Sequence, residues 1–171
     1  MTNRAGSAYV VRAAVSCASV LAVSGVVSAA DVVRHPLPGG STFPIARAVE
    51  VPAGKTIIFH SGTTPAPLDP KAEAGSAAYW GDTKTQALST FARIKESLDA
   101  MKLDFGNVVA MTVYLVGDPA KGGRMDFEGF MAAYSQFFGT KEQPNLPARS
   151  TEVAGLVAPG MLVEIEVQLA K

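Results

Sequence analysis

Apolar residues recur at helical spacing in two stretches of the chain. The first stretch predicts a helix that begins at Asp82 or Thr83, where Thr83 and Gln86 have the spacing of a capping box. Its apolar stripe comprises Leu88, Phe91, Ile94 or Lys95, Leu98 and Met101. The second stretch predicts a helix capped by Asp126. Its stripe is expected to be core rather than a cofactor site and comprises Phe127, Phe130, Met131, Tyr134, Phe137 and Phe138.

Other stretches have the apolar content or the alternation of β-strands. Residues 46–51 and 56–61 flank a Pro-Ala-Gly-Lys turn, and residues 107–116 are apolar enough for a central strand. A further strand begins near Arg149, because Pro147 blocks a helix there. A turn at Pro159-Gly160 implies that this strand forms a hairpin with the last one. One face of the last strand holds Val163, Ile165, Val167 and Leu169, and the other holds Leu162, Glu164, Glu166 and Gln168.

The order of these elements predicts the fold class α/β (α+β), with a single mixed β-sheet and two helices packed on one face. Each helix serves as a right-handed crossover between parallel strands. The opposite face of the sheet has no helix to cover it, which favours an oligomer. Residues 31–42 are expected to form an extended N-terminal arm, and residues 43–171 a single domain. Residues 63–81, rich in proline and glycine, are expected to form a long loop.

Residues 1–30 have the composition of a cleaved secretory signal peptide. Arg4 and Arg12 give a basic start without any acid, residues 13–27 form an apolar run, and small residues offer a cleavage site after Ala29 or Ala30. The run is dominated by small residues and makes a poor bilayer span. We therefore expect an exported, periplasmic protein with no membrane association after cleavage.

The charge balance argues against nucleic acid as a partner. The chain has 15 basic and 15 acidic residues; residues 1–30 contribute two arginines and no acid, which leaves 13 basic and 15 acidic residues and a net charge of −2. Nucleic-acid binding relies on basic side chains that neutralise phosphates. Cys17, the single cysteine, lies in the expected signal, and His35 and His60 lack the spacing of metal ligands. We expect no disulfide, no metal and no other cofactor.

The most informative motif is Pro147-Ala148-Arg149-Ser150-Thr151, followed by Val163-Glu164-Ile165-Glu166. From the residues alone, an arginine and two glutamates on adjacent strands make either a solvated face with a surface ion pair or a ligand site. Together with Ile57-Ile58-Phe59-His60-Ser61-Gly62, the helix entry at 81–86 and Tyr134-Ser135-Gln136-Phe137-Phe138, the motif resembles the Rid/YjgF family of reactive-intermediate deaminases, formerly the L-PSP endoribonuclease family. The resemblance runs from about Phe43 to the C-terminus.

The resemblance implies a homotrimer of chorismate-mutase-like subunits, with three ligand clefts between neighbouring chains. It implies that Arg149 grips the carboxylate of a small 2-imino or enamine acid. Glu164 would hold and polarise the water that attacks the imine carbon. Ser61 and Gly62 match a Ser-Gly turn that lines the same cleft.

Three positions depart from the family pattern. Ile45 stands where many members have a tyrosine, Thr151 where members have a cysteine, and Met131 where members have an asparagine. Ile45 and Thr151 are nevertheless expected to contact the substrate. Glu166 is interpreted as a structural partner of Glu164, and the role of His60 stays open between an ordinary strand histidine and a group behind the cleft.

The implied activity is hydrolytic deamination of small 2-imino or enamine acids to 2-oxo acids and ammonia. The alternative is a non-catalytic exported trimer that binds small carboxylates or acts as a chaperone-like holdase. This alternative arises because export would separate the chain from the largely cytoplasmic enzymes that form such imines. An endoribonuclease would need a basic groove, which the negative net charge disfavours.

Overall fold

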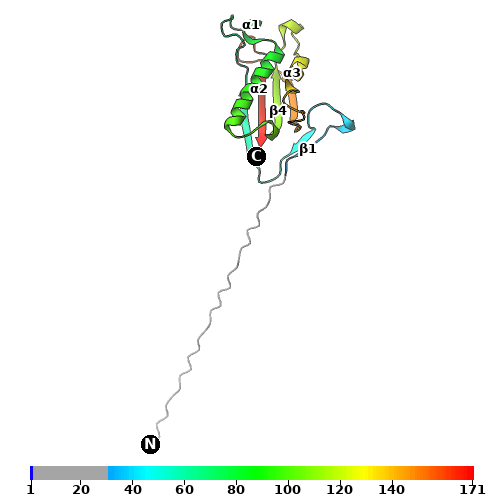
Figure 1. Ribbon diagram of the computed structural model, residues 1–171, viewed down its shortest axis with the longest axis vertical. Coiled ribbons are helices and arrows are strands. Elements are labelled where there is room, and N and C mark those ends of the chain that lie inside the picture. The colour runs from blue at the N-terminus through cyan, green and yellow to red at the C-terminus, as the bar shows by residue number, and fades with distance from the viewer. Residues whose placement is uncertain (2–30) are drawn as a thin grey trace.

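A computed structural model describes Met1 and residues 31–171, so the predicted signal peptide lies outside the described residues. The described part is built on a four-stranded sheet with the order β3-β6-β4-β5 (Figure 1). Its strands are β3 (Ile57–Thr63), β4 (Val108–Leu115), β5 (Ala148–Val153) and β6 (Val163–Ala170). No helix in the described residues is long and apolar enough to span a membrane.

The mixed sheet with two main helices confirms the predicted fold class, but the predicted hairpin of the last two strands is wrong. Strand β6 lies between β3 and β4 and is antiparallel to both. Strand β5 is the edge strand and is parallel to β4. The predicted adjacency of Arg149 and the glutamates is therefore also wrong, because β4 separates them. A local turn signal cannot reveal this order, since the pairing partners of each strand are distant in sequence.

Helix α2 (Thr83–Ala100) begins and packs largely as predicted. Asp82 is the N-cap, and its carboxylate accepts the Thr85 backbone N–H at 2.8 Å. The predicted capping box of Thr83 and Gln86 is wrong, because the Gln86 side chain bonds across the fold instead. Its amide donates to the carbonyls of Gly81 and Gly160, each at 3.0 Å, and accepts from the Leu162 N–H at 2.7 Å. The stripe faces the core through Phe91, Ile94 and Leu98, each fully buried.

Helix α3 (Phe127–Tyr134) is capped by Asp126, as predicted. Its residues Phe130 and Tyr134 pack against α2 in the core and are fully buried. The helix ends before Phe137 and Phe138, which were predicted on the same stripe, and Phe138 reaches the core from the turn that follows. The four-residue helix α1 (Ala77–Trp80) lies within the predicted long loop. Its Trp80 indole donates to the Pro159 carbonyl at 2.9 Å, so the loop is attached to the connection between β5 and β6.

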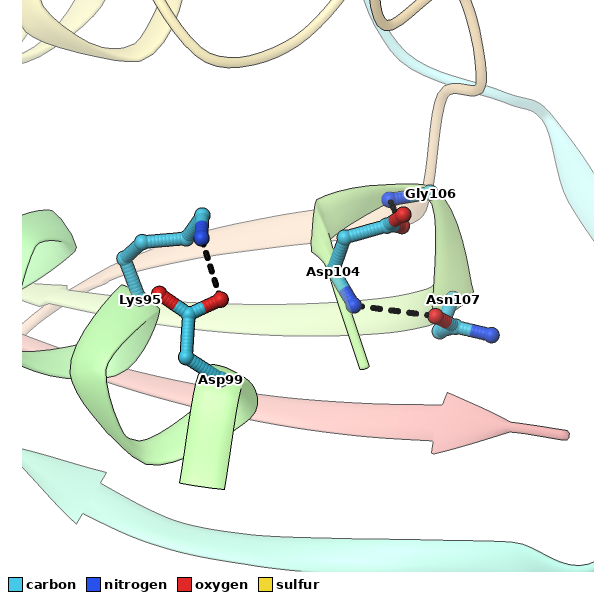
Figure 2. Close-up of polar contacts among 5 residues, drawn as sticks. All are labelled: Lys95, Asp99, Asp104, Gly106 and Asn107. Atoms are coloured by element: carbon cyan, nitrogen blue, oxygen red, sulfur yellow. Dashed lines mark hydrogen bonds and ion pairs between the residues drawn. The ribbon is translucent and has the colours of Figure 1, made fainter. Parts of the chain in front are cut away.

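The connection from α2 to β4 is held by short-range polar contacts (Figure 2). Lys95 and Asp99 pair one helical turn apart near the end of α2. Asp104 caps the 3-10 turn η2 (Phe105–Asn107) by accepting the Gly106 N–H at 2.7 Å, and its own N–H donates to the Asn107 side chain at 3.0 Å. Helix α2 itself ends at the C-cap Met101, and the Asp104 bonds shape the short turn that leads into β4.

The N-terminal arm is attached to the domain. Strand β1 (Val33–His35) pairs with β2 (Ala48–Glu50) in a separate two-stranded sheet, and the 3-10 turn η1 (Pro38–Gly40) lies between them. Arg34 donates to the backbone carbonyls of Leu146, Gly106 and Val108 at 2.9–3.1 Å. Residues 46–51 and 56–61 were predicted as strands around a turn, and the structure pairs β2 with β1 rather than with β3.

The four-stranded sheet has two unlike faces. The helix face is covered by α2 and α3 and holds the predicted apolar side of β6, where Val163, Ile165, Val167 and Leu169 are each at most 1% exposed. The opposite side, which we call the open face, carries Glu164, Glu166 and Gln168 of β6 beside Thr112 and Tyr114 of β4. The sheet therefore has one dry side and one polar side.

A third 3-10 turn, η3 (Pro119–Lys121), follows β4.

Candidate functional site

Arg149 lies on the helix face, in the edge strand β5. It is aligned with Met111 of β4, which is 3% exposed, so its side chain points toward α3 rather than to the open face. Its guanidinium carbon lies over four aromatic rings. These are Phe43 at 5.5 Å, Phe127 at 5.8 Å, Phe130 at 5.2 Å and Tyr134 at 4.3 Å. The predicted carboxylate-binding arginine thus stands in an aromatic pocket.

The Arg149 guanidinium has no anionic partner among the described residues. Its Nη1 atom is buried and makes no hydrogen bond. The ion pairs of residues 31–171 involve other side chains. Desolvation by burial lowers the pKa of Arg149, an effect that Tyr134 partly opposes. A charged group in this position is favourable only when an anion accompanies it.

The segment 43–46 forms one wall of the Arg149 pocket. The Tyr134 hydroxyl donates to the Pro44 carbonyl at 2.8 Å, and the Ala46 N–H donates to the Pro147 carbonyl at 2.9 Å. These bonds fix Ile45, which is half-buried, next to the start of β5. Burial raises the pKa of Tyr134, so its hydroxyl stays protonated and serves as a donor.

Thr151 shares the helix face with Arg149, because side chains two residues apart on a strand point to the same side. The rings around the arginine were not predicted from the sequence. Phe127, Phe130 and Tyr134 were assigned to the core from their helical spacing, and Phe43 was named only as the start of the family resemblance. Their contact with Arg149 depends on the register of β5 against β4, which carries no local signal.

Glu164 lies on the open face and is aligned with Tyr114 of β4. A β-bulge between His60 and Thr63 brings Gly62 against its carboxylate. A Cβ atom added at Gly62 would lie 2.0 Å from the Glu164 Oε1 atom, so only glycine allows this approach. Ser61 and Gly62 were predicted in a turn, but they lie in the bulged end of β3, and Gly62 meets Glu164 within one chain.

Glu166 also lies on the open face and accepts the Tyr114 hydroxyl at 3.2 Å. This hydrogen bond is the main cause of the raised pKa of Tyr114. A hollow of about 260 Å³ lies beside it, lined by residues that include Phe59, Ser61 and Glu166. Ser61 thus shares this hollow with Glu166, on the side of the sheet away from Arg149.

His60 connects the β-bulge to α2. Its Nε2 atom lies 2.8 Å from the Ser97 hydroxyl, and its Nδ1 atom lies 2.9 Å from the Ser61 carbonyl. With the proton on Nδ1, the ring donates to Ser61 and accepts from Ser97. The imidazole therefore supports the bulged end of β3 that carries Ser61 and Gly62.

The predicted site residues form two groups on opposite sides of one sheet. Arg149, Thr151 and Ile45 lie at the helix face near its edge, and we call them the arginine half-site. Glu164, with Ser61 and Gly62, forms the glutamate half-site on the open face. One chain does not bring Arg149 and Glu164 together. Within residues 31–171, no group of three or more His, Cys, Asp and Glu side chains is arranged to hold a metal ion.

The sheet order, the two helices and the arginine pocket define a small α+β protein with a polar open sheet face. A family model described as Endoribonuclease L-PSP matches residues 41–170. The chain belongs to this family, which is also known as the Rid/YjgF family.

The chain is also similar to a curated protein in sequence and to solved structures in fold. Protein DfrA of Myxococcus xanthus is 33% identical over 123 residues, which cover 72% of this chain and 82% of that protein. The Rid-family protein YyfB of Yersinia pestis superposes with a TM-score of 0.58 at 23% identity, covering 81% of this chain and 98% of that one. E. coli TdcF, solved with bound serine, gives a TM-score of 0.53 at 24% identity and covers 81% and 94%.

Proposed function

We propose that this protein hydrolyses small 2-imino and enamine acids to 2-oxo acids and ammonia, in a cleft completed by a neighbouring subunit. Membership of a small-molecule-binding family supports a small ligand. The observation that carries the proposal is the half-buried Arg149, whose buried Nη1 atom has no partner among the described residues. A planar guanidinium in an aromatic pocket suits a bidentate carboxylate.

The ligand's carboxylate would satisfy the free Nη1 atom and fix the plane of the substrate. E. coli TdcF contains bound serine, which carries such a carboxylate. A ligand of the same kind, with an amino-acid-like carboxylate, would suit Arg149 in this chain. The four rings around Arg149 exclude water and strengthen the ion pair.

Hydrolysis then requires a group that handles water. A water molecule held by Glu164 adds through its oxygen to the imine carbon, and the carboxylate takes its proton. The same carboxyl group returns that proton to the nitrogen, which gives a tetrahedral intermediate with a hydroxyl and an amino group. The carboxylate then takes the hydroxyl proton as the C=O bond forms and passes it to the nitrogen as the carbon–nitrogen bond breaks, so that the products are the 2-oxo acid and ammonia. An enamine first becomes the imine by protonation at carbon. The absence of a side chain at Gly62 leaves room for the Glu164 carboxylate.

Because Arg149 and Glu164 lie on opposite sides of the sheet, the proposal requires a glutamate half-site from another chain. We propose a homotrimer, in which the open face of each subunit meets its neighbours. The apolar side chain of Phe59, 77% exposed on β3, supports a covered surface there. Sedimentation at micromolar concentration should give three times the chain mass. A monomer would exclude both the trimer and the shared cleft.

The decisive experiment measures ammonia release from an imine that an amino-acid oxidase forms in situ. Wild-type protein should accelerate the loss of the imine over buffer. Arg149→Ala should slow hydrolysis about 30-fold or more, because a buried pair to a charged group contributes roughly 2–5 kcal/mol. Glu164→Gln should bind a 2-oxo acid normally yet fail to hydrolyse the imine. Equal rates with and without wild-type protein would exclude the deaminase.

Mixing the variants tests the shared cleft directly. Each single variant is inactive, but a trimer assembled from both contains clefts with an intact Arg149 from one chain and an intact Glu164 from the next. Activity should therefore return after the two are unfolded and refolded together. Separately refolded variants, mixed afterwards, provide the control. No recovery in co-refolded trimers of the correct mass would place both residues in one chain's site.

The separation of the two half-sites also favours a second candidate, a non-catalytic trimer that binds small carboxylates through Arg149 alone. This protein would bind a 2-oxo acid without accelerating imine loss, and Glu164→Gln would change nothing. The ammonia assay and calorimetry together distinguish the two candidates.

We also propose that the protein is exported to the periplasm, on the basis of the basic start and apolar run in residues 1–30. Mass spectrometry of the native protein should find a chain that begins at Ala30 or Asp31. An intact N-terminus in a cytoplasmic fraction would contradict export.

A further inference from the structure

A hollow of about 720 Å³ lies beside the arginine half-site. Its apolar lining is Met125, Phe127 and Val153. Val153 belongs to β5 and, four residues after Arg149, points to the same side of the sheet. Phe127 contributes to both places, since its ring lies 5.8 Å from the Arg149 guanidinium carbon and also lines the hollow. The arginine and the hollow are thus neighbours.

Exposed apolar side chains gather around the Phe127 ring. Met125 is 37% exposed and Val153 is 70% exposed. On its other side, Phe43, 39% exposed, stacks on Phe127 with ring centroids 6.4 Å apart. We call these four residues the apolar strip. Apolar surface of this kind in a polar exterior marks a binding site.

The four side chains of the apolar strip carry no hydrogen-bonding group, whereas the rest of the hollow is lined by Gly123 and the charged residues Lys121, Arg124, Asp126 and Glu128. Lys121 lies 3.8 Å from Asp126, and Asp126 caps α3 through the Gly129 N–H. The Tyr134 hydroxyl donates to the Pro44 carbonyl. A polar ligand side chain that lay on the strip itself would lose its water without gaining a partner there. An apolar side chain would gain from burial.

We infer that the arginine half-site selects carboxylates with a bulky apolar side chain, aromatic or branched, and that this side chain lies on the apolar strip. The inference rests on the proposed carboxylate-binding role of Arg149 and adds the class of ligand. In this arrangement the Arg149 guanidinium binds the carboxylate, and the neighbouring apolar strip contacts the rest of the ligand.

The first test compares two 2-oxo acids, phenylpyruvate and pyruvate, by calorimetry with the wild-type protein. Both carry the carboxylate, and they differ in the phenyl group. Phenylpyruvate should bind at least about tenfold more tightly, because the ring removes apolar surface from water. Equal affinities would overturn the inference while leaving the carboxylate site intact. Absence of binding by both would instead refute the proposed function.

The second test uses Met125→Ser and Val153→Ser, with Val157→Ser as the matched control. Val157 is an apolar residue 88% exposed in the connection after β5, and it does not line the hollow. Each strip variant should weaken phenylpyruvate binding about three- to tenfold and change pyruvate binding less than twofold. The control should change neither.

The oligomer mass of each variant completes the test. If the strip variants bind both ligands as the wild type does, the strip is not part of the ligand site. If they dissociate the oligomer and weaken both ligands equally, the strip is a contact between subunits. Either result would overturn the inference.

Discussion

Replacing Arg149 by methionine should stabilise the ligand-free protein and abolish carboxylate binding. The reason is the environment of the guanidinium, whose Nη1 atom is buried without a hydrogen bond in the described structure. Such a group costs folding free energy in the empty protein, and a bound carboxylate recovers that cost. A residue kept for function at the expense of stability behaves in this way.

The magnitude follows from two opposing contributions. A buried donor without a partner costs about 1–3 kcal/mol. The rings offset part of this cost, since cation–π contacts contribute about 0.5–2 kcal/mol and the Tyr134 ring is only 4.3 Å away. Methionine fills similar space and packs favourably on aromatic edges. We therefore expect Arg149→Met to stabilise the protein by about 1 kcal/mol, or roughly 4 °C in Tm.

The assay is thermal unfolding of wild type and variant at one protein concentration, with and without phenylpyruvate. The ligand should raise the Tm of the wild type and leave that of the variant unchanged. Arg47→Met is the control, because Arg47 is exposed and should change stability by less than about 0.5 kcal/mol. A loss of more than about 1 kcal/mol in Arg149→Met, with an unchanged response to ligand, would show that the arginine is structural and refute the reasoning.

Three further predictions concern single contacts. Gly62→Ala should lower turnover at least about tenfold with under about 1 kcal/mol lost in stability, because its Cβ displaces only the Glu164 carboxylate; unchanged kinetics would contradict this contact. Gln86→Leu should cost about 3 kcal/mol in urea unfolding, since the Leu162 N–H and two carbonyls lose their partner, and a cost below about 1 kcal/mol would count against it. The pKa of Asp82 is lowered mainly by its bonds from Thr85, so its charge stabilises the fold above about pH 4 and this contribution disappears as pH falls through the lowered pKa. Asp82→Asn, which keeps the cap, should approach wild-type stability in acid, and a difference independent of pH would refute this.

The local elements could be read from the sequence. The stripe of α2, the Asp126 cap of α3 and the alternation of β6 all agree with the structure, because helix and strand periodicity depends on near neighbours. The family could also be predicted from short motifs, because the segment around Arg149 and the segment around Glu164 are each an unbroken run of residues. Pro147 also predicted a strand near Arg149, and β5 begins at Ala148.

Only the tertiary structure decided how these elements meet. The turn at Pro159-Gly160 favoured a hairpin, yet β4 lies between β5 and β6, because strand order depends on the summed burial of distant strands. Gln86 had the spacing of a capping box and instead bonds across the fold to Gly160 and Leu162. The register of β5 turned Arg149 toward the rings of α3, whereas β6 turned Glu164 to the open face. Motifs therefore singled out the candidate residues of the two half-sites, and strand pairing placed them on opposite sides of the sheet.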